Sequence, residues 1–233
     1  MAQNVSHRIA SLASLVVAVS VIAVGSVVAS GPLSSGSATV VAANPATNDV
    51  GRGDDDLVAP RTISSGDEDY AMVFDGTSQY GQVTTAGANN FLPTGDITVS
   101  AWAYPTSTAG YRRVVNRADA FSILNVDGTW QFEIGDYDES ESNWSTITGP
   151  PVVANSWTHV ALTRSASTVT AYVNGQVVGT TTQSVAMPTT YDFDVGSLNT
   201  GAHFFQGRID DVRIYSDARS QSEIEADMHN YGP

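Results

Sequence analysis

Aromatic and acidic side chains gather in the polar stretch between Gly135 and Pro150, where no apolar periodicity calls for them. Sugar-binding sites combine an aromatic surface, which packs on the apolar face of a sugar ring, with polar groups that bond its hydroxyls. Aromatic side chains in polar loops indicate function, because no core requires them there. The stretch therefore predicts a glycan-binding site formed by Tyr137, Trp144, Asp136 and Asp138.

The same stretch contains Asn143-Trp144-Ser145, the acceptor pattern for N-linked glycosylation. This pattern is typical of an exterior loop. A glycan attached there would partly cover Trp144, which weakens the case for a sugar site at that residue.

The charge balance excludes some classes of partner. Asp and Glu number 24 against ten basic residues, all of them arginine, for a net charge of −14. Sequence-independent binding of nucleic acid needs a basic surface, which this chain lacks. Such acidity is typical of a halophilic protein, because high salt screens the repulsion between the negative side chains. Ordinary surface acidity is the alternative.

The chain begins with an uncharged run of 21 residues, from Ile9 to Ala29, behind His7 and Arg8. Small residues near position 30 fit a cleavable signal peptide, whereas the length is close to the ~20 residues that span a bilayer. Residues 1–30 are therefore predicted to form a hydrophobic helix that serves as a signal peptide or as a membrane or assembly anchor. Either role places the protein in the extracellular space or on a cell or virion surface.

Residues 31–68 are rich in Gly, Ser, Ala and Asp and have no sustained apolar period. Such a segment buries too little surface to order itself, so a flexible acidic linker is predicted. The chain has no cysteine, so neither a disulfide framework nor a Cys-ligated metal site can support the fold.

Residues 69–233 are predicted to form one domain of short strands. Asn174-Gly175 and Asp127-Gly128 stand between alternating apolar residues, as two-residue hairpin turns with positive φ do. Many short strands with regular turns predict an antiparallel β-sandwich. Ser220 and Glu223 form a capping box that begins a short C-terminal helix. The tryptophans inside the predicted strands are expected in the core: Trp102, Trp130 and Trp157.

Five patterned segments follow one another in a fixed order: Val73–Tyr80, Ile97–Pro105, Trp157–Thr163, Tyr172–Val178 and Phe205–Tyr215. Together they resemble the laminin G-like, concanavalin A-like lectin/glucanase family of jelly-roll domains, over about residues 69–230. The resemblance implies an all-β jelly-roll sandwich whose two antiparallel sheets pack face to face. It also implies rim loops that often hold ligand and calcium.

The resemblance further points to a structural calcium ion at Asp75 and at Asp210 or Asp211. The first and last strands of a jelly roll lie close together, so these carboxylates could meet, and a divalent cation would relieve their repulsion. The alternative is that Asp75 only begins a turn through local backbone hydrogen bonds and that Asp211 pairs with a neighbouring arginine, Arg213 or Arg208. Both interpretations stay open.

Related jelly rolls also include glycoside hydrolases, which need two carboxylates, carried on a strand as Glu-x-Asp-x-x-Glu. The nearest segment, Asp136 to Glu141, reads Asp-x-Asp-x-x-Glu and lies in a polar stretch that we expect to be a loop. We therefore predict no catalytic residue.

The sequence as a whole predicts a non-enzymatic extracellular surface protein whose jelly-roll domain binds glycans or surface glycoproteins or mediates adhesion, with calcium as a structural aid. It would contact a membrane only through its N-terminal segment. One alternative is a structural or decoration protein of a cell envelope, filament or virion that contacts neighbouring copies. A second alternative is a divergent glycoside hydrolase.

Overall fold

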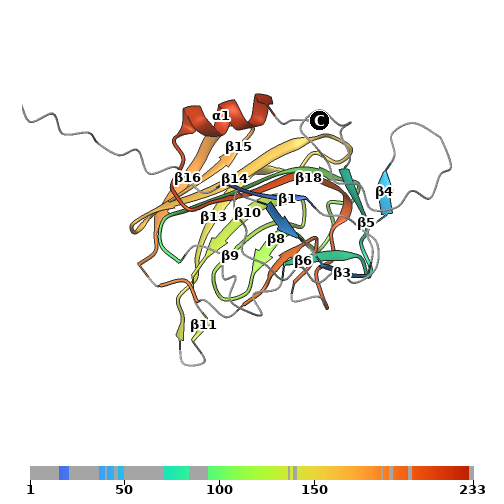
Figure 1. Ribbon diagram of the computed structural model, residues 1–233, viewed down its shortest axis with the longest axis horizontal. Coiled ribbons are helices and arrows are strands. Elements are labelled where there is room, and N and C mark those ends of the chain that lie inside the picture. The colour runs from blue at the N-terminus through green and yellow to red at the C-terminus, as the bar shows by residue number, and fades with distance from the viewer. Residues whose placement is uncertain are drawn as a thin grey trace, which may run out of the picture.

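Most of the described chain forms strands in two sheets that pack face to face, with one helix near the C-terminus (Figure 1). The structure is a computed structural model. It describes residues 71–83, 94–135, 143–184, 186–188, 191–198 and 201–229, together with the backbone of 16–20, 37–39, 41–44, 47–49, 137–138, 141–142 and 230. This arrangement confirms the predicted antiparallel jelly-roll β-sandwich with a short C-terminal helix.

The first sheet is built around its two longest strands, β7 (Ile97–Pro105) and β18 (Gln206–Tyr215), which pair antiparallel. Outward from β7 lie β14 (Thr158–Ser165), β15 (Thr168–Val173) and the edge strand β16 (Gln176–Thr182). On its other side, β18 pairs with β5 (Ala71–Asp75) and β1 (Val16–Ser20), which pair in turn with β4 (Thr47–Asp49) and β2 (Ser37–Thr39).

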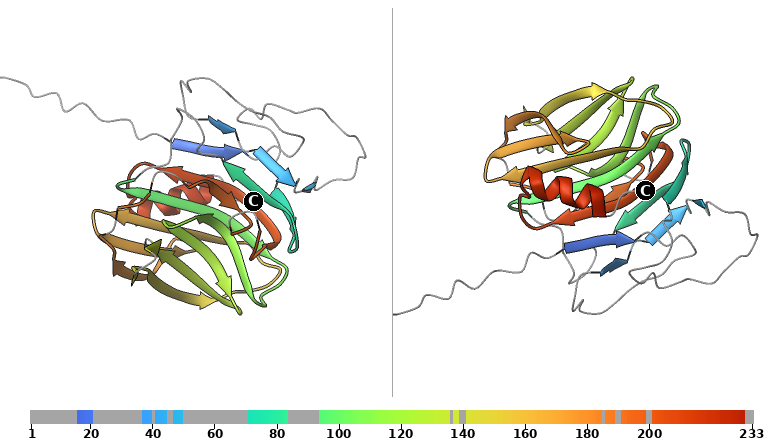
Figure 2. Two further views of the ribbon diagram at one scale, coloured as in Figure 1. Left: turned by 90° about the horizontal axis from the view of Figure 1, so that it is seen from below. Right: turned by 90° about the horizontal axis from the view of Figure 1, so that it is seen from above.

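The second sheet begins at the edge strand β13 (Ser145–Pro151). It continues through β10 (Thr129–Ile134), β9 (Phe121–Val126), β8 (Tyr111–Arg117), β17 (Phe193–Val195), β6 (Tyr80–Val83) and β3 (Val41–Asn44). A separate hairpin of β11 (Tyr137–Asp138) and β12 (Glu141–Ser142) pairs with neither large sheet. Figure 2 shows the two large layers from below and from above.

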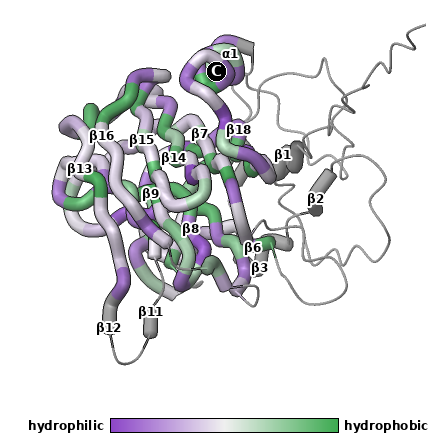
Figure 3. The backbone as a smooth tube through the Cα atoms, turned by 90° about the vertical axis from the view of Figure 1, so that its left-hand side faces the viewer, coloured by the Kyte–Doolittle hydropathy of each residue, from purple (hydrophilic) through white to green (hydrophobic). Residues whose placement is uncertain are grey.

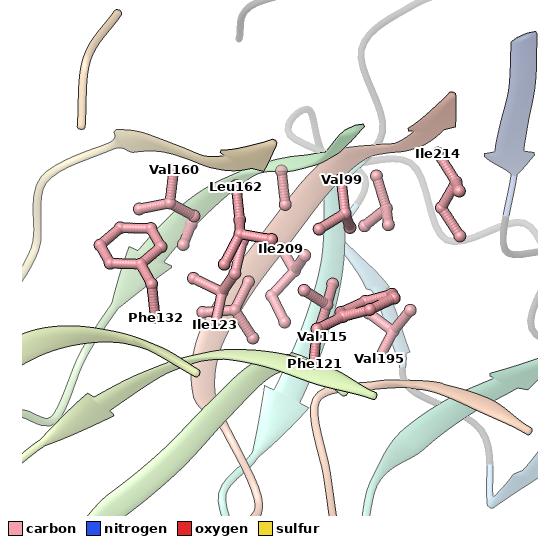
Figure 4. Close-up of a cluster of buried hydrophobic side chains, with 14 of the residues drawn as sticks. Val99, Val115, Phe121, Ile123, Phe132, Val160, Leu162, Val195, Ile209 and Ile214 are labelled. Atoms are coloured by element: carbon pink, nitrogen blue, oxygen red, sulfur yellow. The ribbon is translucent and has the colours of Figure 1, made fainter. Parts of the chain in front are cut away.

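Alternation along each strand decides which side chains enter the core. In β7, Val99 and its alternate neighbours lie between the sheets, and in β10 Trp130 and Phe132 do the same from the opposite layer. Figure 4 shows side chains of the two layers interleaving, with Leu162 and Phe121 among them. Full burial of each large apolar side chain stabilises the fold by about 1.5–3 kcal/mol.

The three tryptophans that we expected in strands have different surroundings, and Trp157 lies just before β14. Trp130 is 1% exposed and lies in the core, as predicted. Trp102 and Trp157 are only half-buried, and neither belongs to the core cluster. The small Ala101 and Ala103 take the inward positions of β7, so Trp102 between them must face outward.

Both predicted hairpin turns form. Asn174 and Gly175 have φ of 50° and 75°, and Asp127 and Gly128 have φ of 45° and 85°. Two successive positive φ values are what a two-residue turn needs to match the twist of the flanking strands.

The helix α1 (Gln221–Asn230) packs across the outward face of the first sheet (Figure 2). Its N-terminus is capped as predicted, because the Glu223 carboxylate accepts a hydrogen bond from the Ser220 backbone N–H at 2.8 Å. This hydrogen bond, with a second one from the Ser220 hydroxyl, lowers the pKa of Glu223. Ile224 is fully buried against Ala161 and Tyr172, which fixes the helix on the sheet.

The N-terminal third differs from expectation where it is described. Val16–Ser20 is a strand, whereas we expected a helix over 1–30; three of its five residues are valine, which favours extended backbone. Three short strands also lie within the predicted linker, and the remainder of both segments falls outside the described residues. No helix in the described part of the chain is long and apolar enough to cross a membrane.

Candidate functional site

An open groove of about 550 Å³ lies at one edge of the sandwich, between β13, the edge strand of the second sheet, and β16, the edge strand of the first. The predicted ligand residue Trp144 is half-buried in its wall. All of its other lining side chains are polar and uncharged: Asn143, Ser145, Ser167, Thr182, Gln183 and Ser184.

Hydrogen bonds between the edge strands hold this groove in shape. The Ser145 hydroxyl at the start of β13 donates to the Thr182 carbonyl at the end of β16 at 3.1 Å. The Gln183 side-chain amide donates to the carbonyl of Asn143 and, at 3.5 Å, to that of Ile134. The chain segment that carries Trp144 is therefore tied to both sheets.

Gly135 is required for this close packing. A Cβ at position 135 would lie 2.8 Å from the Trp144 Cα and would also meet the Asn143 carbonyl oxygen. Both contacts are with backbone, which cannot turn aside as a flexible side chain can. Glycine thus lets the end of β10 run directly beneath the residue that carries the aromatic ring.

The hairpin of β11 and β12 leads into the groove and projects from the sandwich (Figure 1). The next strand, β13, lies beside β16 (Figure 3). Tyr137 pairs with Ser142 and Asp138 with Glu141, so the stretch that we expected to be a loop contains a short hairpin. The structure describes only the backbone of Tyr137 and Asp138, and Asp136 lies outside the described residues. Of the four predicted ligand residues, Trp144 is the one that the structure places in the groove wall.

Asp75 holds a turn through its own carboxylate. Its Oδ1 accepts the backbone N–H groups of Thr77, Ser78 and Gln79 at 2.8, 2.9 and 3.2 Å. Partial desolvation raises the pKa of Asp75, but the hydrogen bonds from Ser78, Thr77 and Gln79 outweigh it and hold the pKa well below its ordinary value. This is the local arrangement that we gave as the alternative to calcium binding.

Asp211 is likewise engaged nearby. The Arg213 Nε donates to its Oδ1 and Oδ2 at 2.7 and 2.8 Å, beside a β-bulge at which Asp211 has φ of 45°. The pairing with Arg213 that we gave as an alternative is therefore present.

The three predicted metal ligands lie on two paired strands, Asp75 on β5 and Asp210 and Asp211 on β18. Asp75 pairs with Gln206, and Asp210 lies four residues further on, which is about 13 Å at the usual rise of a strand. Within the described residues, no group of three acidic or histidine side chains could hold a metal ion. Calcium binding at Asp75, Asp210 and Asp211 stays a prediction, and these three residues do not lie together as the ligands of one ion would.

We expect Asp75→Ala to lower the free energy of unfolding by about 1 kcal/mol, because three backbone N–H groups lose their acceptor. Urea unfolding, with calcium and with a chelator, measures this. An equal loss in both solutions assigns the carboxylate to the turn alone. A melting temperature that rises with calcium in the wild type, but less in Asp75→Ala, would instead support a calcium site.

The pH dependence of this contribution follows from the lowered pKa. It is present above the ordinary Asp pKa of 3.8 and is lost as the pH falls below that value, because the unfolded chain takes up the proton first. Asp75→Asn should flatten that part of the acid-unfolding curve.

Sequence reasoning missed a row of polar side chains that crosses the outward face of the second sheet. The strand register aligns Gln82, Asp194, Asn116, Ser122, Glu133 and Thr146, one from each of six adjacent strands. The hint in the sequence is the alternation in Thr129–Ile134, where Gln131 and Glu133 separate buried apolar residues. Which polar residues share a row depends on the register between strands, which no single segment reveals.

Arg113 joins the middle of this row. Its Nη1 donates to Glu133 Oε2 at 2.9 Å and to Asn116 Oδ1 at 3.5 Å. Burial lowers the pKa of His203, and Arg113 lowers it further against a smaller opposing effect of Glu133. The His203 ring stacks on the half-exposed ring of Tyr111, with 5.3 Å between centroids. Asn116, Ser122 and Asp194 are buried, so the middle of this row is closed to a ligand and satisfies its polar groups within the protein.

The fold is that of a lectin-like jelly-roll protein. Residues 75–225, more than half of the chain, match the family described as the concanavalin A-like lectin/glucanases superfamily. The chain belongs to this superfamily, as the resemblance predicted.

Solved structures with the same fold include domain 4 of AbnA, a GH43 extracellular arabinanase from Geobacillus stearothermophilus, in complex with arabinotriose. Its identity to this chain is 20%, its TM-score is 0.55, and the match covers 83% of each chain. The binding domain of botulinum neurotoxin serotype D matches 70% of this chain at 14% identity and a TM-score of 0.54. The binding domain of Paraclostridial Mosquitocidal Protein 1 matches 71% at 19% identity and the same TM-score.

This chain spans only 42% and 44% of those two toxin domains. At such identities the likeness shows the fold and not a shared ligand. A comparison with curated proteins finds no match.

Proposed function

We propose that this chain is a non-enzymatic glycan-binding module on the outside of a cell or virion, and that it binds sugar in the groove beside Trp144. The observation that carries the proposal is one half-buried tryptophan in a groove otherwise lined by hydroxyl and amide groups. A sugar ring needs both: the aromatic ring packs on its C–H face, and the polar groups bond its hydroxyls.

The lining of the groove favours binding over hydrolysis. Glycoside hydrolysis needs two carboxyl groups on either side of the scissile bond, one protonated and one ionised. None of the described lining residues is acidic. The domain 4 of AbnA was solved with arabinotriose, which supports glycan binding as a use of this fold.

The proposed exterior location rests on the N-terminal apolar run and the acidic composition. A structural calcium ion remains an additional proposal, tested by the Asp75 experiment above. Self-association, as in an envelope or virion decoration protein, is the competing role.

We expect Trp144→Ala to weaken glycan binding at least tenfold. A tenfold change in Kd is about 1.4 kcal/mol, within what the buried face of one large aromatic side chain supplies. A glycan array identifies ligands of the wild type, and calorimetry with arabinotriose or the best array ligand gives Kd. Tyr111→Ala, which removes an exposed aromatic ring outside this groove, is the matched control and should leave Kd unchanged.

Unchanged affinity in Trp144→Ala would contradict this site. An array without any ligand would favour the assembly role. Release of reducing sugar from β-glucans by the purified wild type would contradict the non-enzymatic reading.

A further inference from the structure

Asn143 places a glycosylation acceptor pattern on the wall of the groove. The side chain is exposed, and it lies between β12 and β13 with Trp144 and Ser145 directly after it. The pattern Asn-X-Ser is read by oligosaccharyl transferases on exterior proteins. The structure thus joins two features that the sequence alone leaves separate, an accessible acceptor amide and a half-buried aromatic ring on one wall.

We propose that Asn143 carries an N-linked glycan and that the first sugars of this glycan lie on Trp144, so that the protein fills its own groove. This inference rests on the exterior location and the groove proposed above. It adds a covalent ligand in cis that controls access of free glycans to the same surface.

The attachment step uses a lipid-pyrophosphate-linked oligosaccharide as donor. The bond between the sugar C1 and the phosphate oxygen breaks, and a bond forms between C1 and the Asn143 Nδ2. The amide proton passes to a base of the transferase, and the lipid pyrophosphate leaves. No oxidant or reductant takes part.

The local structure favours a fixed position for the attached sugar. The Asn143 carbonyl accepts the Gln183 amide, and Gly135 lies beneath the Trp144 Cα, so the backbone of the acceptor and of the residue that follows it is held. The groove volume of about 550 Å³ falls within the range of small-ligand sites, which gives room for a short oligosaccharide.

Covalent attachment makes such a glycan a strong competitor. A group on a short tether has an effective concentration of about millimolar at its site. A free glycan of equal affinity therefore competes with the tethered one only at free concentrations above about millimolar.

Mass spectrometry of protein isolated from the cells that produce it tests the attachment. Trypsin releases the peptide 118–164, between Arg117 and Arg164, which contains Asn143. We expect this peptide to carry added sugar mass in the wild type and in Ser145→Thr, which keeps the acceptor pattern, and none in Ser145→Ala or Asn143→Gln. Wild-type peptide at the bare polypeptide mass would overturn the proposal.

Oxidative footprinting of the same four proteins tests where the glycan lies. We expect oxidation of Trp144 to be several-fold faster in Ser145→Ala and Asn143→Gln than in the wild type and Ser145→Thr. Equal oxidation in all four would overturn the placement on Trp144.

Protein made in a host without N-glycosylation separates this inference from the proposed function. If that protein binds arabinotriose or an array glycan through Trp144 while the native peptide is unmodified, glycan binding stands and the tethered glycan fails. If the native peptide is modified and the unmodified protein binds no glycan, the proposed function fails alone.

Discussion

Lowering the pH from 7 to 4 is expected to reduce the free energy of unfolding by about 3 kcal/mol through His159 alone. His159 is 1% exposed on β14, and its ring meets that of Trp102 edge-on at 5.4 Å. Burial lowers the pKa of His159 to about 4, and the positive charge of Arg213 adds to the effect. The folded protein therefore keeps this side chain neutral where the unfolded chain would charge it.

The sign of the effect follows from proton uptake. As the pH falls through the ordinary His pKa of 6.5, the unfolded chain binds a proton at position 159 and the folded protein does not until about pH 4. The unfolded state binds more protons across this window, so stability falls as the pH falls. Below about pH 4 both states are protonated and the contribution of this residue levels off.

Urea unfolding at intervals between pH 7 and 4 measures this slope. His159→Leu should remove most of it, whereas His229→Gln, an exposed histidine on α1, should keep it. A smaller slope of the same sign should persist in His159→Leu, because burial and Arg113 also lower the pKa of His203. A His159→Leu protein whose slope equals that of the wild type would contradict the assignment.

Asp227→Ala is expected to destabilise the fold by about 3 kcal/mol, the lower end of the cost of breaking a buried ion pair. The Asp227 carboxylate accepts the Tyr215 hydroxyl at 2.7 Å and pairs with Arg219 Nε at 2.9 Å. The Arg219 guanidinium also lies over the Tyr215 ring at 4.3 Å. Removing the carboxylate leaves both partners near α1 without their acceptor.

Urea unfolding and limited digestion with trypsin follow this change, because cleavage after Arg219 reports release of α1. Glu225→Ala is the matched control: that carboxylate lies on the same helix but accepts only partly exposed amides of Gln176 and Gln221, so it should cost under about 1 kcal/mol. Stability of Asp227→Ala equal to that of Glu225→Ala would show that the network does not anchor the helix.

Local patterns proved readable from the sequence because the partners lie within a few residues. The turns at Asn174-Gly175 and Asp127-Gly128, and the cap formed by Ser220 and Glu223, follow from the preferences of those residues alone. The turn at Asp75 belongs to the same class, since its carboxylate bonds the next few backbone N–H groups. Turns and helix caps of this kind can be predicted without knowing the fold, because the interacting groups are close in the sequence.

Features that depend on the register between strands, or on contacts between the edges of the two sheets, were harder to predict from the sequence. Trp102 has the size of a core residue, but alanines take the inward positions of its strand. Its ring lies on the outward face instead and packs edge-on against that of His159. The groove wall at Trp144 requires β13 and β16 to meet, although they come from different sheets. The polar row through Asn116 and Glu133 likewise exists only once six strands are aligned.

The hairpin of β11 and β12 has a further consequence for how this fold can diversify. In the described part of the chain its two strands pair only with each other and with neither large sheet, and β12 ends two residues before Trp144. A change in the length of this hairpin would leave the pairing of the two large sheets unchanged, because neither of its strands takes part in that pairing. Related chains could thus differ in the length of this hairpin, and in ligand selectivity at the groove beside it, with no change in the stability of the sandwich.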